Sequence, residues 1–156
     1  MNELRTMADI LVINGPNLNL LGTREPHIYG DRSMDDIMVS LRDAFPAISI
    51  DEVRTNEEGA IVTALQGANG RVMGVVLNAG GYSHTSVAIR DAISAMDVPV
   101  VEVHLSNLLA REPFRHVSIL GAVCVGSIMG LGAQGYALAV RYLLERVNER
   151  RTGPAV

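Results

Sequence analysis

A carboxylate and an imidazole stand two residues apart at the end of an apolar segment. The segment covers residues 98–103, and Glu102 and His104 lie at its C-terminal end. In a β-strand, side chains alternate between two faces, so these two side chains would point to the same side. A carboxylate beside an imidazole orients the ring and supports proton transfer from it. The pattern therefore predicts a general acid at His104, supported by Glu102.

An arginine and a tyrosine form a second candidate pair. Arg24 and Tyr29 lie five residues apart in the segment 17–30, where prolines and glycines disfavour a helix. An ordinary tyrosine has a pKa of about 10 and is a weak base at neutral pH. A nearby guanidinium stabilises the phenolate, which makes the pair a candidate base on a lid over the site. On its own, a tyrosine in such a loop is usually a packing residue.

Amides, a second imidazole and a hydroxyl follow the other apolar segments. Asn17 comes after the first segment, Asn78 and His84 after the third, and Ser106 after the fourth. Each has a simpler interpretation when it is taken alone. Asn17 after a proline is more often a turn former than a ligand. His84 is equally consistent with a residue at a helix N-terminus whose ring bonds to the backbone.

The elements that must position these groups alternate along the chain. β-Strands are predicted at residues 9–14, 48–53, 72–77, 98–103 and 122–129. Two helices are predicted first, one from Ser33, with Asp36 completing a capping box, to Phe45, and one from a cap at Asn56 to the glycines at 67 and 70. Two more are predicted over 86–96 and 133–150, and Tyr136 lies on the apolar stripe of the last helix. Such alternation forms an open parallel sheet with helices on both faces. We therefore predict an α/β fold, a flavodoxin-like five-stranded parallel sheet in the order 2-1-3-4-5.

The predicted sheet brings the candidate groups together. Ligands of such sheets bind beyond the carboxyl ends of the strands, at the switch point beside the first strand. The first, third and fourth strands are neighbours there, so their polar side chains would line one crevice beneath the lid. Arg111 and Arg115 lie four residues apart, a spacing that could place them on one helical face. They are either solvated surface residues or hold an anionic or hydroxylated ligand.

Composition limits the class of protein. The chain has 156 residues, 48% of them apolar, which fits one compact domain over residues 9–150. We assign residues 1–8 to an N-terminal extension and residues 151–156 to a disordered tail. The net charge of −4 argues against nucleic-acid binding. The single cysteine, Cys124, fits a reducing compartment, and no signal peptide or membrane span is recognised, so we expect a cytoplasmic protein.

Several kinds of cofactor chemistry are disfavoured. All thirteen basic residues are arginines, so a lysine Schiff base is excluded. The four histidines and the cysteine show no metal-ligand spacing. Gly130, Gly132 and Gly135 resemble a dinucleotide-binding pattern, but no acidic residue follows on a later strand, so close packing of helix on sheet explains them better.

The main alternative function is a nucleotide- or flavin-binding module. Such a module needs a phosphate-binding loop after the first strand. Pro16 removes a backbone donor from that loop and so argues against this alternative.

Four segments of the chain resemble one known family. They are NGPNLNLLGTREPHIYG, LNAGGYSHTSVAIRDA, VEVHLSNLLAREPFR and GLGAQGY, and they are similar to the motifs of type II dehydroquinase, the type II 3-dehydroquinate dehydratases. The resemblance covers about residues 10–146. It implies a flavodoxin-like fold, trimers assembled into a dodecamer, and no cofactor. It also implies the dehydration of 3-dehydroquinate to 3-dehydroshikimate, in the shikimate pathway of aromatic amino acid biosynthesis or in quinate breakdown.

The resemblance assigns roles to the catalytic candidates. Tyr29 would remove a proton from C2 of the substrate, and Arg24 would lower the pKa of that tyrosine and close the lid. Asn17 would hold a water that stabilises the enolate oxygen. His104 would protonate the departing C1 hydroxyl, with support from Glu102. A related protein that assembles but does not catalyse would be expected to have lost Tyr29, Arg24 or His104. All three are present, so this alternative is disfavoured.

Substrate binding is assigned to six further residues by the same resemblance. These are Asn78, His84 and Arg115 for the substrate hydroxyls, the backbone N–H groups of Leu105 and Ser106 for the carboxylate, and Asp91, which would reach the site of a neighbouring subunit. Two departures from the family pattern, at Ser33-Met34 and over residues 121–129, affect no site residue.

Overall fold

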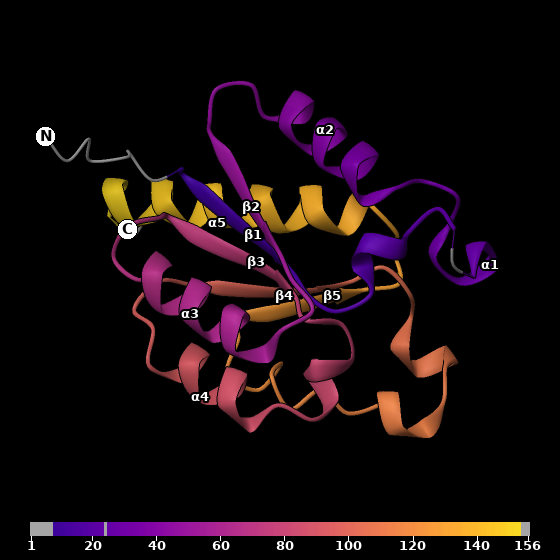
Figure 1. Cartoon of the computed structure of the whole chain (residues 1–156). Coiled ribbons are helices and arrows are strands. Elements are labelled where there is room, and N and C mark those ends of the chain that lie inside the picture. Colours follow the sequence, from indigo (N-terminus) through magenta and orange to yellow (C-terminus); the bar gives the residue numbers. More distant parts are fainter. Residues whose placement is uncertain (1–7, 24, 154–156) are drawn as a thin grey trace, which may run out of the picture.

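The computed structural model describes residues 8–23 and 25–153 and shows a five-stranded parallel sheet between two layers of helices (Figure 1). The order of the sheet is β2-β1-β3-β4-β5, as predicted. The strands are β1 (Ile10–Asn14), β2 (Ile50–Arg54), β3 (Gly74–Asn78), β4 (Val100–His104) and β5 (Gly126–Met129). The longer helices are α2 (Met34–Ala44), α3 (Glu58–Ala68), α4 (Val87–Ser94) and α5 (Gln134–Thr152). Within the described ranges, no helix has the length and apolar character needed to cross a membrane.

Each face of the sheet is covered by two helices. Helices α2 and α5 lie on one face, and α3 and α4 lie on the other (Figure 1). Side chains alternate along β1, so Ile10 and Val12 pack in the core beneath α2 and α5, whereas Leu11 and Ile13 pack in the core beside α3 and α4. Both cores are built almost entirely from aliphatic side chains. The aliphatic core agrees with the scarcity of aromatic residues in the sequence.

The strand register decides which polar side chains can meet. Asn14 at the end of β1 aligns with Asn78 at the end of β3, and both point to the α2–α5 face. Leu77 aligns with Glu102 on β4, so Glu102 and His104 point to the opposite, α3–α4 face. The two faces of the sheet therefore supply different polar groups to the same end of the sheet.

Two glycines permit close packing, Gly15 beyond the carboxyl end of β1 and Gly74 at the amino end of β3. A Cβ at Gly15 would lie 2.7 Å from the carbonyl carbon and oxygen of Ala79, because the loops that follow β1 and β3 touch there. The Gly15 N–H also donates to the Asn78 carbonyl at 2.7 Å. A Cβ at Gly74 would lie 2.6 Å from Cδ2 of Leu143, so α5 packs directly on β3. The main-chain contact at Gly15 excludes any side chain, whereas a side chain at position 74 would require the Leu143 side chain to shift.

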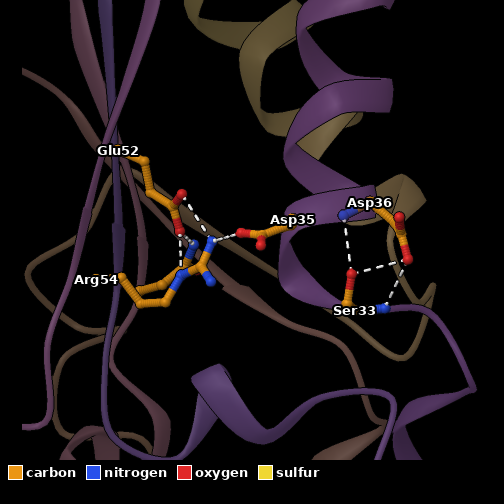
Figure 2. A network of polar contacts seen from close by, with 6 residues as sticks. Ser33, Asp35, Asp36, Glu52 and Arg54 are labelled. Carbon is orange, nitrogen blue, oxygen red and sulfur yellow. Dashed lines mark hydrogen bonds and ion pairs between the residues drawn. The ribbon is translucent and has the colours of Figure 1, made fainter.

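Helix α2 begins with the predicted capping box. The Ser33 hydroxyl accepts the Asp36 N–H at 3.1 Å, and the Asp36 carboxylate accepts the Ser33 N–H at 3.1 Å (Figure 2). Two backbone donors that have no partner within the helix are thereby satisfied. The cap fixes the point at which the segment between β1 and α2 ends.

The segment 17–30 contains more helix than predicted. Leu18–Leu20 form a 3-10 turn (η1), and Pro26–Tyr29 form one α-helical turn (α1). Pro26 stands at the first position of α1, where its missing N–H would have no partner in the helix. The expectation that this segment is not helical is wrong for these two turns.

Other differences concern the ends of elements. Asn56 does not cap α3, because its side-chain oxygen instead accepts the N–H of Asn17 at 3.0 Å. The last strand is shorter than predicted, since residues 119–125 form turns and bends. Helix α5 continues to Thr152, into the segment expected to be a disordered tail. The rest of that tail from 154 onward, and residues 1–7 of the expected extension, lie outside the described residues. The remaining strands match their predicted ranges within two residues.

Candidate active site

A crevice that is open to solvent lies beyond the carboxyl ends of β1, β3 and β4. Its position is the one predicted from the strand order. The polar residues that line it are Asn17, Asn78, His84, His104, Ser106, Arg111 and Arg115. Leu105, also a predicted site residue, lines it as well. The structure thus brings together seven of the predicted site residues, which come from three strand ends and the loops that follow them.

Glu102 lies behind His104 and is completely buried. The Ser118 hydroxyl donates to Glu102 Oε2 at 2.5 Å, and the Ser127 hydroxyl donates to Oε1 at 2.9 Å. His104 Nε2 lies 3.4 Å from Oε2. Burial by itself raises the pKa of Glu102, but the contacts with His104 and the two serines outweigh it, and the pKa lies below its ordinary value. Glu102 is therefore an ionised carboxylate at neutral pH, held behind the imidazole.

Glu102 and His104 are close enough for an ion pair, but the geometry between them is not that of a hydrogen bond. Nε2 of His104 is buried and makes no hydrogen bond among the residues that the structure describes. The predicted orientation of both side chains to the same face is confirmed. Hydrogen bonds of catalytic groups are often long before a substrate is bound and shorten in the complex. The pair has the arrangement that a general acid with a carboxylate partner requires.

His84 stands at the end of the 3-10 turn η2 (Gly80–His84) and faces His104. The two rings are stacked, with their centroids 6.3 Å apart. His84 Nδ1 lies 2.8 Å from the carbonyl oxygen of Val117, which can only accept, so Nδ1 carries a proton. The contact of the ring with the backbone is therefore confirmed, and the ring also lines the crevice, but a role in binding stays a prediction.

Asn78 forms part of the floor of the crevice and is almost fully buried. Its Nδ2 donates to the Tyr136 hydroxyl at 2.9 Å, and its Oδ1 accepts the Gly80 N–H at 3.2 Å. The Tyr136 hydroxyl donates in turn to Asn14 Oδ1 at 2.6 Å. Burial raises the pKa of Tyr136, so the side chain remains a neutral phenol. Sequence reasoning placed Tyr136 only on the apolar stripe of its helix and missed this contact.

Two guanidinium groups form one wall of the crevice. Arg111 Nη1 donates to the Ser106 hydroxyl at 3.3 Å, and Arg115 Nε donates to Glu112 Oε2 at 2.7 Å. The arginines do not share a helical face as their spacing had suggested. Arg111 follows one short 3-10 turn, η3 (Leu108–Ala110), and Arg115 ends the next, η4 (Pro113–Arg115). Guanidinium groups in this position suit a ligand with a carboxylate or hydroxyl groups.

Four predicted site residues, namely Arg24, Tyr29, Asp91 and the buried Glu102, are not among the described residues that line the crevice. Arg24 and the side chain of Tyr29 are outside the described part of the chain, so their predicted roles stay predictions. Asn17 lines the crevice with a left-handed backbone (φ 69°), a conformation that asparagine tolerates in turns. Asp91 is exposed on α4 and does not line the crevice of its own chain. Within residues 8–23 and 25–153, no three His, Cys, Asp or Glu side chains group as a metal site would require.

Comparison with known proteins places the chain in a family. The family model described as Dehydroquinase class II matches residues 8–144. The chain belongs to the class II dehydroquinases. The family resemblance that the four sequence motifs suggested is thereby confirmed.

Individual relatives cover almost the whole domain. The chain is 53% identical over 142 residues to a 3-dehydroquinate dehydratase of Jannaschia sp., with 90% of this chain and 96% of the relative covered. It is 48% identical over 146 residues to a catabolic 3-dehydroquinase of Penicillium rubens, with 92% and 94% covered. The crystal structure of type II dehydroquinase from Butyrivibrio crossotus superposes with a TM-score of 0.84 at 42% identity, covering 86% of this chain and 96% of that one. The fold of the class II dehydroquinases, a five-stranded sheet of flavodoxin-like order, is therefore the fold of this chain.

Proposed function

We propose that this protein is a 3-dehydroquinate dehydratase, which removes water from 3-dehydroquinate to give 3-dehydroshikimate. The observation that carries the proposal is the buried, ionised Glu102 behind His104, at the edge of a crevice lined by amide, imidazole and guanidinium groups. Membership of the class II dehydroquinases and the names of the relatives support the same reaction.

The substrate is a β-hydroxy ketone that loses water through an enolate. The reaction needs a base at the carbon next to the ketone, a group that stabilises the enolate oxygen, and an acid at the departing hydroxyl. We assign the acid to His104, which Glu102 keeps oriented. We assign the base to Tyr29, with Arg24 stabilising its phenolate form. The base and the acid act on opposite sides of the substrate, so the elimination is anti.

The enolate and the rest of the substrate are assigned to groups at the strand ends. Asn17 holds a water against the enolate oxygen. The backbone N–H groups of Leu105 and Ser106 bind the substrate carboxylate. The side chains of Asn78, His84 and Arg115 bind its hydroxyl groups. All these residues line the crevice, which supports the assignment but does not test it.

The mechanism requires neither an imine nor a cofactor. The chain has no lysine, so it cannot form a Schiff base with the ketone. Enolate formation with a tyrosine base and a histidine acid needs no redox group. Treatment with borohydride in the presence of 3-dehydroquinate should leave the enzyme active, and covalent trapping would contradict this mechanism.

The assembly and location belong to the same proposal. Asp91 is exposed on the surface of α4, where it is available to the site of a neighbouring subunit. We propose a dodecamer, built as a tetramer of trimers, in the cytoplasm, acting in the shikimate pathway or in quinate breakdown. A size measurement by light scattering tests the assembly, and a stable, active monomer would contradict it.

The direct test is an assay with 3-dehydroquinate that follows the absorbance of the conjugated product. The wild-type protein should turn over this compound. Tyr29→Phe should reduce turnover by about 100-fold or more, because it removes the proposed base. Tyr142→Phe is the matched control, since Tyr142 is an exposed tyrosine on α5. A folded wild-type protein without turnover would overturn the proposed function, and a Tyr29→Phe enzyme of normal activity would overturn the base.

A further inference from the structure

A chain of hydrogen bonds with a fixed direction runs from the edge strand β2 to the floor of the crevice. It passes from Glu52 through Asn14 and Tyr136 to Asn78. We propose that Glu52 is a positioning residue, which acts through Asn14 and Tyr136 to set the orientation in which the Asn78 amide meets the substrate. This inference rests on the proposed function, because it concerns the substrate contact of Asn78.

The series of hydrogen bonds begins at the Glu52 carboxylate, which has acceptor atoms only. Arg54 Nε donates to Glu52 Oε1 at 2.8 Å, and Arg54 Nη2 donates to Oε2 at 2.9 Å (Figure 2). The Glu52 side chain is only 13% exposed. A carboxylate that accepts hydrogen bonds from two nitrogens of one guanidinium is held in place, and it cannot act as a donor. Glu52 therefore imposes a direction on its next neighbour.

That neighbour is the fully buried amide of Asn14. The two ends of an amide have nearly the same shape, so only their hydrogen-bond partners decide which end points where. Asn14 must turn its nitrogen to Glu52, and Nδ2 donates to Oε1 at 2.9 Å. Its oxygen is then turned to Tyr136 and accepts the hydroxyl proton at 2.6 Å.

The single hydroxyl proton of Tyr136 carries the direction one step further. Because that proton points to Asn14, the Tyr136 oxygen can only accept on its other side. Asn78 must therefore turn its nitrogen to Tyr136, and Nδ2 donates at 2.9 Å. Its oxygen accepts the N–H of Gly80 at 3.2 Å, which agrees with the same orientation. Each of these choices follows from the one before it.

The orientation of Asn78 decides which groups remain for a ligand. The amide has one N–H and one oxygen lone pair that neither Tyr136 nor Gly80 uses. A substrate hydroxyl can donate to that oxygen or accept that N–H, but at fixed places in the crevice. If the amide turned over, donor and acceptor would exchange places, and the Gly80 N–H would face a second donor. A flipped Asn78 should therefore bind the substrate less tightly.

The competing explanation is that these buried groups only stabilise the fold. The two explanations differ in whether the KM of the folded enzyme changes. A purely structural loss lowers the melting temperature and the amount of active enzyme, but leaves the KM of the remaining enzyme unchanged. A wrongly oriented Asn78 raises KM in protein that is fully folded.

The first test replaces Glu52 with glutamine in the full-length enzyme. Glu52→Gln keeps the shape of the side chain but adds a donor, so Asn14 is no longer forced into one orientation. We expect the KM for 3-dehydroquinate to rise by about three- to tenfold, the range for one lost uncharged hydrogen bond, with kcat within about twofold of wild type. Asp35→Asn is the matched control, because it removes the other carboxylate bound to Arg54 but no link of the chain. Its KM should equal that of the wild type.

The second test is Tyr136→Phe, with the exposed Tyr142→Phe as its control. Removal of the Tyr136 hydroxyl leaves two buried amides without a common partner, and KM should rise by at least as much as in Glu52→Gln. If this variant fails to fold, Glu52→Gln decides the question alone. An unchanged KM in folded Glu52→Gln would overturn the proposal. An inactive wild-type enzyme would instead overturn the proposed function, so the two failures are distinguishable.

A third measurement does not depend on variants. Neutron diffraction from crystals of the deuterium-exchanged wild-type protein locates the hydrogens of the amides and the phenol. The deuterium of Tyr136 should lie between its oxygen and Asn14, and a deuterated nitrogen of Asn78 should face Tyr136. The opposite orientation of either group would overturn the proposal.

Discussion

Glu52, which is partly buried, and Glu102, which is fully buried, lie on opposite faces of one sheet near the same crevice, and their partners differ. Glu52 on β2 is bound by the guanidinium of Arg54, which is charged at every accessible pH. Glu102 on β4 is bound by two serine hydroxyls and approached by a histidine, whose charge can change. A carboxylate with a permanent cation fixes the direction of neighbouring hydrogen bonds. A carboxylate with a titratable partner can support the movement of a proton.

The position of each glutamate in the sheet is consistent with its partners. β2 is an edge strand, where the long side chain of Arg54 can reach Asp35 near the surface. β4 lies inside the sheet between β3 and β5, where Glu102 has no access to solvent. Short serine hydroxyls fit that space, whereas a second arginine would require a much larger opening. The comparison agrees with the two proposed roles, in which Glu52 orients the substrate site and Glu102 supports catalysis.

The sharpest way to break this comparison is to neutralise the two glutamates in turn. Glu102→Gln should lower kcat by about 100-fold, the lower end of the range for general acid–base catalysis, because His104 loses its charged partner. Glu52→Gln should leave kcat nearly unchanged and raise KM. Steady-state kinetics with 3-dehydroquinate measures both effects. Equal losses of kcat in the two variants would show that the glutamates do not differ in role.

A smaller effect is expected from the serines that hold Glu102. Ser127→Ala removes the donor to Oε1 and leaves a buried carboxylate oxygen with one partner fewer. We expect a loss of about 1–3 kcal/mol in the free energy of unfolding and a fall in kcat of several-fold. Denaturant unfolding and kinetics measure the two effects. Ser94→Ala, at an exposed serine on α4, is the control. Normal stability in Ser127→Ala would mean that Ser118 alone holds the carboxylate.

The pH dependence of stability should also distinguish Glu102. Its pKa in the folded protein lies below the ordinary value of about 4.3 that it has in the unfolded chain. As the pH falls, the unfolded chain binds the proton first, so the stabilising contribution of Glu102 is present above about pH 5 and is lost through the acid range below it. Melting temperatures of wild type and Glu102→Gln should therefore converge between about pH 5 and pH 3. Parallel curves would contradict the lowered pKa.

The smallest effect is expected at the outer end of the Glu52 network. Asp35 lies 2.9 Å from Arg54 Nη2, but its side chain is 83% exposed (Figure 2). Exposed ion pairs contribute about 0–1 kcal/mol and weaken with salt. Asp35→Asn should therefore change the free energy of unfolding by less than about 0.5 kcal/mol, as measured by chemical denaturation. A change above 1 kcal/mol would mean that Arg54 needs both carboxylates to stay in place.

The features that follow from local periodicity could be predicted from the sequence. The two-residue period of a strand was sufficient to place Glu102 and His104 on the same face. The alternation of strands and helices was sufficient to predict the sheet order and the crevice at the carboxyl ends of β1, β3 and β4. The cap at Ser33 was also correct, because a capping box involves residues only three positions apart.

Contacts between distant residues could not be predicted in the same way. The period of α5 correctly placed Tyr136 toward the core, but its hydroxyl meets Asn14, which is 122 residues away. A buried tyrosine hydroxyl needs a partner, and that was the only signal present. Asn56 has the right type and position for a helix cap, yet a donor 39 residues away, the Asn17 N–H, takes its side-chain oxygen. At Asn56 the local preference therefore gave way to a tertiary contact, whereas at Tyr136 a tertiary contact was added to a correct local prediction.

The contact between Gly15 and Ala79 limits how this crevice can acquire a new substrate preference. A methyl group at position 15 would meet main-chain atoms, which cannot rotate away as the end of a flexible side chain can. The distance between the loop after β1 and the loop after β3 is thus set mainly by this main-chain contact. Leu18, Leu21 and Leu108 in the walls are buried side chains, and cores tolerate side-chain substitutions of similar volume better than a clash with main chain. Variants selected for altered substrates should therefore carry their substitutions in the walls and retain glycine at position 15.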